Sequence, residues 1–196
     1  MKPTRLLALT AVVGLIGALA GCDVFMASKL GRWNPLDPDN ELVGVSKTLS
    51  PVVDGYVQDV APERNFSAPS LMASEGYTGN QSILLVFADV PVSVDSALLQ
   101  LDCRNGSGWV DVYPIGRAWS PDSVDYPETL SAEFIDYAAI GGGDVQVWGL
   151  VTLDVTEVAR YMAGNGNYGM ILKHYGTALE FARGPKLIID GRDIPE

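Results

Sequence analysis

The chain holds few residues of the types that catalytic and metal centres use. Its 196 residues include one histidine, His174, and two cysteines, Cys22 and Cys103. Hydrolase triads pair a nucleophile with a histidine, and most zinc sites need several Cys or His ligands. The three glycines at 141–143 lack the strand-to-helix setting of a phosphate loop. These observations predict a protein that is not an enzyme.

Cys22 closes an uncharged apolar run near the N-terminus. The run at 6–20 follows two basic residues, and its length of about 15 suits a signal-peptide core better than a membrane span, which needs roughly 20. It ends in the tetrapeptide LAGC at 19–22, which resembles the lipobox of bacterial prolipoproteins. That resemblance implies acylation of Cys22 and removal of a signal peptide at 1–21. An ordinary secretory signal and a permanent transmembrane anchor are the alternatives.

The segment 116–144 holds the side chains that best suit sugar binding. A sugar site needs aromatic faces for the apolar side of the ring and a few polar groups for its hydroxyls. Trp119, Tyr126 and Tyr137 lie in this segment, which we expect to be mostly loop, and functional residues concentrate on loops. We predict these rings as the carbohydrate contacts. Most other aromatics, Trp148 among them, are expected to pack in the core or at its rim.

Three carboxylates, Asp122, Asp125 and Glu128, lie in the same segment. Two of them could form the acid and base pair of a glycosidase, but an acidic loop in an acidic protein is more often a solvated surface. The whole chain has a net charge of −11, and loss of residues 1–21 would bring it to −13. This charge argues against nucleic acid, whose binding depends on Lys and Arg. It also argues against electrostatic docking on anionic lipid, so acyl chains should provide the membrane contact.

Residues 22–50 are predicted to be the lipidated cysteine and a flexible tether, with two prolines and several turn formers. From residue 51 to 192 the pattern changes to short strands of alternating or continuous apolar residues separated by turn formers. Cys103 shares one face of its strand with Leu99 and Leu101, so we expect a small buried apolar residue rather than a reactive thiol. Strands are expected at 53–60, 70–73, 82–90, 97–103, 109–115, 145–155, 168–175, 178–182 and 186–190.

One short helix is expected near residues 155–163. Asp154 can cap its first turn, with Glu157 as the reciprocal partner. An apolar stripe follows at helical spacing, and Gly164 is expected to end the helix. The stripe consists of Val155, Val158, Ala159 and Met162. The predicted fold is therefore an all-β, jelly-roll-like β-sandwich with one short helix.

Several motifs together resemble a known family. The segment LDVTEVARY at 153–161, followed by NYGMILK at 167–173, is similar to the C-terminal signature of DNRLRE (disaggregatase-related) domains, which overlap carbohydrate-binding module family 96. The resemblance covers about residues 51–190 in the right order. Its other parts are DGYV at 54–57, SILLVF at 82–87, SALLQL at 96–101, VDVY at 110–113 and PKLII at 185–189.

The resemblance implies a jelly-roll sandwich that binds polysaccharide, including acidic polymers such as alginate, in an extracellular or envelope protein. Because the chain is acidic, a bridging cation would be needed for such a polymer, and Asp54 and Asp59 are the predicted ligands of a structural Ca²⁺. We therefore expect a non-catalytic lipoprotein in the cell envelope, on the inner or outer membrane, that binds polysaccharide. The alternative is a structural or adhesive surface protein that contacts another protein.

Overall fold

A computed structural model describes residues 41–60, 64–76, 79–135, 140–146 and 148–195, all within one compact unit of the chain. The predicted signal peptide and Cys22 lie outside the described residues. Within these ranges, no helix is long and apolar enough to cross a membrane.

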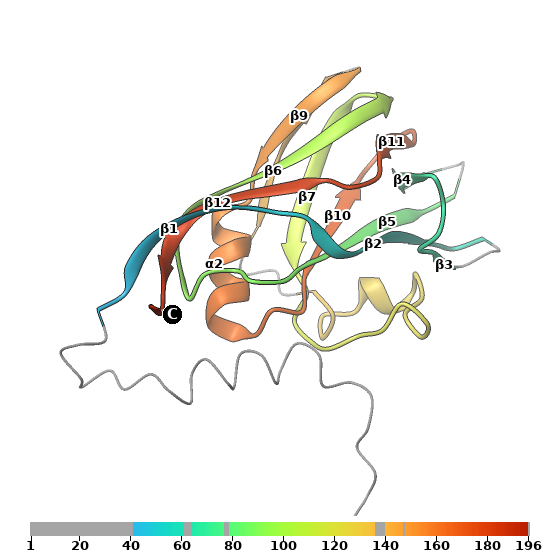
Figure 1. The fold of residues 1–196 in the computed structure, drawn as a ribbon. Helices are drawn as coiled ribbons and strands as arrows, with labels where there is room; N and C mark the ends of the chain where they lie inside the picture. The colour runs from blue at the N-terminus through green and yellow to red at the C-terminus, as the bar shows by residue number, and fades with distance from the viewer. Residues whose placement is uncertain (1–40, 61–63, 77–78, 136–139, 147, 196) are drawn as a thin grey trace, which may run out of the picture. The chain divides into compact units, whose positions relative to one another are not determined.

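The described part of the chain consists mainly of β-strands (Figure 1). In chain order the elements are β1 (Val43–Leu49), β2 (Pro51–Gln58), β3 (Arg64–Asn65), β4 (Ser70–Ala73), β5 (Gln81–Phe87), β6 (Ser93–Asn105), β7 (Gly108–Pro114), the 3-10 turn η1 (Glu128–Leu130), β8 (Gly141–Val145), β9 (Gly149–Asp154), α2 (Thr156–Asn165), β10 (Met170–His174), β11 (Leu179–Ala182) and β12 (Lys186–Asp193).

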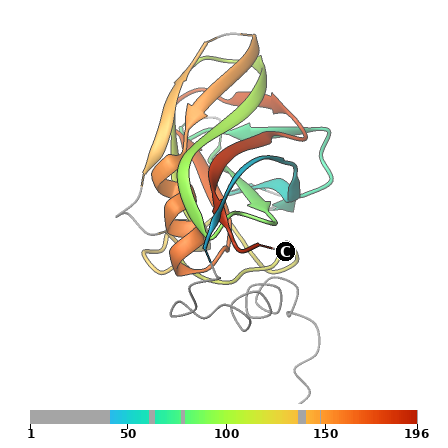
Figure 2. The ribbon, with the colours of Figure 1, turned by 60° about the vertical axis from the view of Figure 1, so that its left-hand side comes forward.

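The strands form one curled antiparallel sheet, in the order β1-β12-β6-β9-β8-β7-β10-β5-β2-β3, with β11 bridging β4 and β6. Figures 1 and 2 show the sheet folding over on itself, with α2 packed beside β6. The predicted all-β, sandwich-like fold with one short helix is confirmed.

The main core fills the inside of this curl. Alternate residues of each strand point into it, which is why apolar side chains recur with a period of two. On β6 these residues are Ala97, Leu99, Leu101 and Cys103, and on α2 they are Val158, Ala159 and Met162. Cys103 is a buried free thiol, as the alternation predicts.

A second core lies on the outer face of β2, β5, β10 and β7, under the segment 116–135. Strand β5 is apolar on both faces because it contributes Ile83 and Leu85 to the main core and Leu84 to the second. Arg64 of β3 ties the covering segment down by donating from Nε to the Val124 carbonyl at 2.6 Å. The segment is therefore a packed lid over the sheet rather than an open loop.

Two boundary predictions were wrong. Residues 43–49 belong to the sheet rather than to a tether, since β1 pairs with β12 from Val43 to Leu49. An edge strand needs a backbone partner more than buried side chains, and none of the side chains of β1 is fully buried, so its sequence gave no burial signal. The predicted strand at 145–155 is two strands, β8 and β9, because the backbone turns between them at Trp148 and Gly149, both with positive φ.

The helix starts as predicted but ends later. The Asp154 carboxylate accepts a hydrogen bond from the Thr156 backbone N–H at 2.9 Å. The predicted partner Glu157 instead forms an ion pair with Arg160. The helix continues through Gly164 and ends before Gly166, which has a φ of 99°, a backbone conformation that favours glycine.

Candidate functional site

The structure places the predicted sugar-binding rings in the second core. Trp119 is partly buried, and its Nε1 donates to the Tyr168 carbonyl at 2.7 Å. Its ring packs against Phe66 and Phe134, with centroids 5.9 and 6.5 Å away. A ring held on both sides in this way braces the segment against the sheet and has little face left for a ligand.

Tyr126 is buried in the same cluster, with only 5% of its surface exposed. Burial, together with the negative charges of Glu75 and Asp59, raises the pKa of Tyr126 to about 12. The prediction that this ring stacks on a sugar is wrong, because segment 116–135 folds back on the sheet and covers it. Tyr137 lies outside the described residues.

Neither aspartate of the predicted calcium site is arranged to hold a cation. The Asp54 carboxylate is paired with Arg183 and also accepts from the Gly184 backbone N–H at 3.2 Å. Asp59 accepts two hydrogen bonds from Asn80, at 3.0 and 2.7 Å. Among the described residues, no three His, Cys, Asp or Glu side chains come together as metal ligands. Both carboxylates are thus engaged by neighbouring side chains and backbone of the domain, and the calcium site stays a prediction.

The acidic residues of segment 116–135 are also used structurally. Asp125 accepts from the Glu128 backbone N–H at 2.8 Å and so caps η1, while the Glu128 carboxylate pairs with Arg117. Two of the three predicted carboxylates therefore stabilise segment 116–135 through a backbone hydrogen bond and an ion pair.

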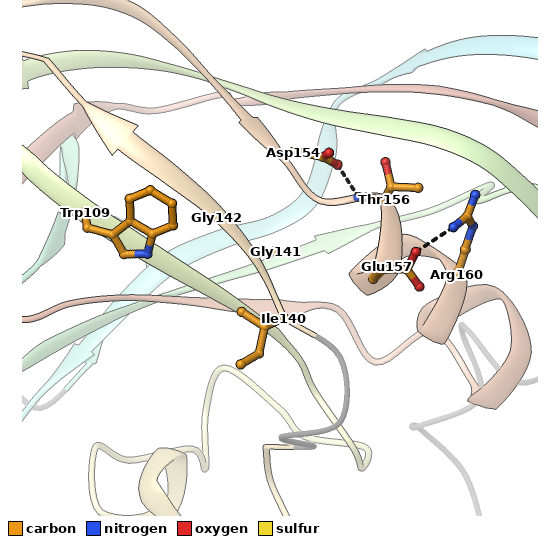
Figure 3. A pocket seen from close by; sticks show the side chains of 8 residues that line it. All are labelled: Trp109, Ile140, Gly141, Gly142, Asp154, Thr156, Glu157 and Arg160. Carbon is orange, nitrogen blue, oxygen red and sulfur yellow. Dashed lines mark hydrogen bonds and ion pairs between the residues drawn. The ribbon is translucent and has the colours of Figure 1, made fainter.

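A pocket of about 530 Å³ opens instead on the outer face of β7, β8 and β9, beside the start of α2 (Figure 3). We call it the Trp109 pocket. Its lining combines an indole, an aliphatic side chain, two glycines and four polar side chains. These residues are Trp109, Ile140, Gly141, Gly142, Asp154, Thr156, Glu157 and Arg160.

Trp109 forms one wall of the pocket, and 58% of its surface is exposed. Its Nε1 donates to the Asp111 carboxylate at 2.7 Å, which fixes the ring direction. The alternation of β7 explains the exposure, because Val110 and Val112 point into the main core and their neighbours must point out. Trp109 is therefore an exception to the expectation that most aromatic side chains outside 116–144 pack in the core or at its rim. The polar Asp111 on the same face was the sequence signal for it.

Glycines of β8 form the floor, where a loop was expected. A Cβ on Gly141 would lie 2.6 Å from the Asp154 carbonyl oxygen, and one on Gly142 would lie 2.4 Å from the Val110 carbonyl oxygen. Side chains at these positions would strike the neighbouring strands, so the close strand packing requires glycine. The consequence for the surface is a stretch of bare backbone between Trp109 and the helix, as Figure 3 shows.

The opposite wall is polar and comes from the end of β9 and the first turns of α2. Hydrogen bonds from Thr156 lower the pKa of the Asp154 carboxyl, which therefore stays ionised. Arg160 pairs with Glu157 at 2.5 Å and donates to the backbone carbonyls of Val94 and Asp95 at 3.0 and 2.8 Å. These bonds fix Arg160 and leave carboxylate oxygens as the main acceptors that the wall presents.

An aromatic face beside fixed hydrogen-bonding groups suits a ligand with both apolar and hydroxyl surfaces. Comparison with known proteins gives no match to this chain, either among family models or among curated sequences.

Proposed function

We propose that the protein is a non-catalytic lipoprotein of the cell envelope whose β-sandwich domain binds polysaccharide in the Trp109 pocket. The observation that carries the proposal is the exposed indole of Trp109, held by Asp111 beside a glycine floor and a polar wall. Burying an indole face against a pyranose ring gives apolar contact, while the wall can accept hydrogen bonds from hydroxyl groups.

The state of the pocket carboxylates supports binding without bond cleavage. A glycosidase needs one carboxyl with a raised pKa to protonate the leaving oxygen. Asp154 has a lowered pKa, and Glu157 is ion-paired with Arg160. Both therefore serve better as acceptors for a bound sugar than as proton donors to a glycosidic bond.

The envelope location rests on the N-terminal sequence. The apolar run at 6–20 and the lipobox-like tetrapeptide ending at Cys22 support export and acylation. The acidic composition supports attachment through acyl chains rather than through charge.

The proposal is tested with Trp109→Ala in the full-length protein, purified in detergent and titrated with a panel of neutral, acidic and amine-bearing polysaccharides. We expect binding to weaken about tenfold or more, since removing a central aromatic contact costs above about 1 kcal/mol. The melting temperature should change little because the ring is mostly exposed. Trp119→Ala is the matched control: it should lower the melting temperature while the folded fraction binds normally.

Unchanged binding by Trp109→Ala would reject this pocket as the site. Failure of the wild-type protein to bind any polysaccharide, together with saturable binding to one purified envelope protein, would favour the structural or adhesive alternative. Release of new reducing ends would show that the protein is an enzyme.

A further inference from the structure

The outer face of β9 leads from the Trp109 pocket, which Asp154 lines, to an exposed apolar end. Val151 and Leu153 point into the main core, so the alternating Leu150, Thr152 and Asp154 share the outer face. Leu150 is 69% exposed. At about 3.3 Å per residue it lies roughly 13 Å along the strand from Asp154, which lines the pocket.

A second exposed tryptophan stands at this far end. Trp148 immediately precedes β9, is 72% exposed, and has a φ of 65°, a strained value for a side chain of its size. Figure 1 shows β9 extending from α2 to the end of the domain that lies away from the C-terminus, where the strand begins. The exposed side chains of Trp148 and Leu150 contribute little to the core. Neighbouring apolar side chains that are exposed in this way indicate a contact surface.

Carboxylates border the surface between the two ends. Asp144 lies opposite Trp109 in the β7–β8 register, and Asp111 lies opposite Gly142. With Asp154 and Glu157 they make the surface acidic. On β6, Asp102 lies opposite Leu150 and pairs with the exposed Arg104 at 2.8 Å. The other cations beside this surface are Arg160, which is paired with Glu157, and Lys173, which is buried and lies opposite Asp111 on β10.

This distribution selects the charge of a ligand. Five carboxylates beside this surface outnumber three cations, and the chain as a whole has a net charge of −11. An anionic polymer would be repelled both locally and at long range, while a cationic one would be attracted. Protonated amines can donate charge-assisted hydrogen bonds to Asp144 and Asp154, and an ammonium group over an indole face is also favoured.

Resting on the proposed function, we infer that the ligand is an extended polysaccharide of amino sugars with free, protonated amines. It runs from the Trp109 pocket along β9 to Leu150 and Trp148. Short chains fill the pocket alone, while longer chains also cover the apolar end. The acidic surface gives preference for amines, and the two exposed tryptophans give preference for length.

The test compares β-1,4-linked glucosamine oligomers with N-acetylglucosamine oligomers of the same lengths. The full-length protein is titrated calorimetrically with each series, at a pH where the free amines are protonated. We expect the glucosamine series to bind about tenfold more tightly, and added salt to reduce this difference because it screens exposed charge. Affinity should rise with chain length.

Variants separate the two parts of the inference. Trp148→Ala should weaken the binding of long glucosamine oligomers and leave that of short ones unchanged. Asp144→Asn should reduce the preference for free amines, whereas Asp190→Asn on β12 serves as the control, because this exposed carboxylate lies outside the surface and should leave the preference intact.

Each outcome has a distinct meaning. Equal affinity for the two series would overturn the charge preference while the proposed function stands. Equal loss of short and long oligomers in Trp148→Ala, or no loss of either, would overturn the path along β9. Failure of both series, with other polysaccharides still bound through Trp109, would overturn the inference alone. Failure of every polysaccharide would overturn the proposed function, and Trp148-dependent binding of a purified protein would assign the apolar end to a protein partner.

Discussion

Replacing Tyr126 with alanine should lower the stability of the domain without altering its proposed ligand site. Tyr126 is 5% exposed and packs in the second core with Leu84, Phe134 and Ile171. Truncating a buried aromatic ring usually costs about 3–5 kcal/mol through lost burial and the cavity left behind. In a domain of this size each kcal/mol corresponds to about 2–4 °C, so the melting temperature should fall by about 6–20 °C.

The assay pairs thermal unfolding with polysaccharide titration, and Trp109→Ala is the comparison. The two variants should behave oppositely: Tyr126→Ala loses stability and keeps binding per folded molecule, while Trp109→Ala keeps stability and loses binding. If Tyr126→Ala melted like the wild type and bound sugar more weakly, the ring would be a ligand contact and the packing argument would be refuted.

The Tyr126 phenol also makes a prediction about alkaline pH. Its pKa is raised from 10.0 to about 12 in the folded protein, mainly by burial. Between these values the unfolded chain loses the phenolic proton while the folded chain keeps it, so the unfolded state binds fewer protons and stability falls as pH rises. Below about pH 10 the stabilisation is fully present. Tyr126→Phe, which cannot ionise, should show a shallower loss of stability from pH 10 to 12 in denaturant titrations.

Two further changes test the Asp54–Arg183 ion pair and the predicted lipid anchor. Asp54→Ala should lower the free energy of unfolding by about 1–3 kcal/mol, because Arg183 loses its charged partner, and Ca²⁺ should not change the melting temperature of either protein. A calcium-dependent rise in the wild type that is lost in Asp54→Ala would establish a metal site instead. Cys22→Ser should abolish incorporation of labelled fatty acid in bacterial cells, and equal labelling of both proteins would contradict lipidation.

The strands that bury apolar side chains were predictable, because burial forces a period of two or a continuous apolar run. The segment 70–73 was predicted with its observed bounds, and the burial of Cys103 followed from its register with Leu99 and Leu101. Strand β1 was missed because it has no fully buried apolar side chains. An edge strand is specified by the backbone hydrogen bonds of β12, which leave no mark on the composition of residues 43–49.

The candidate site was harder to predict because it depends on contacts distant in sequence. Whether segment 116–135 is an open loop or a packed lid is decided by residues elsewhere, such as Arg64 on β3 and Lys173 on β10, which donate to its carbonyls. Because the segment packs on the sheet, Trp119 lies against the second core. Aromatic content alone therefore does not distinguish a buried ring from an exposed one.

Among the described tryptophans, exposure distinguishes Trp109 and Trp148, which belong to the proposed site, from Trp119 in the second core. Exposure follows from strand register. Trp109 alternates with the buried Val110 and Val112, so it must face outward. Trp148 sits in the turn that divides β8 from β9, a turn that could not be placed while 145–155 was taken as one strand. An exposed indole that is fixed by a carboxylate leaves apolar surface in contact with water and contributes no burial to the core. Its presence is better explained by a ligand that covers it than by the stability of the fold.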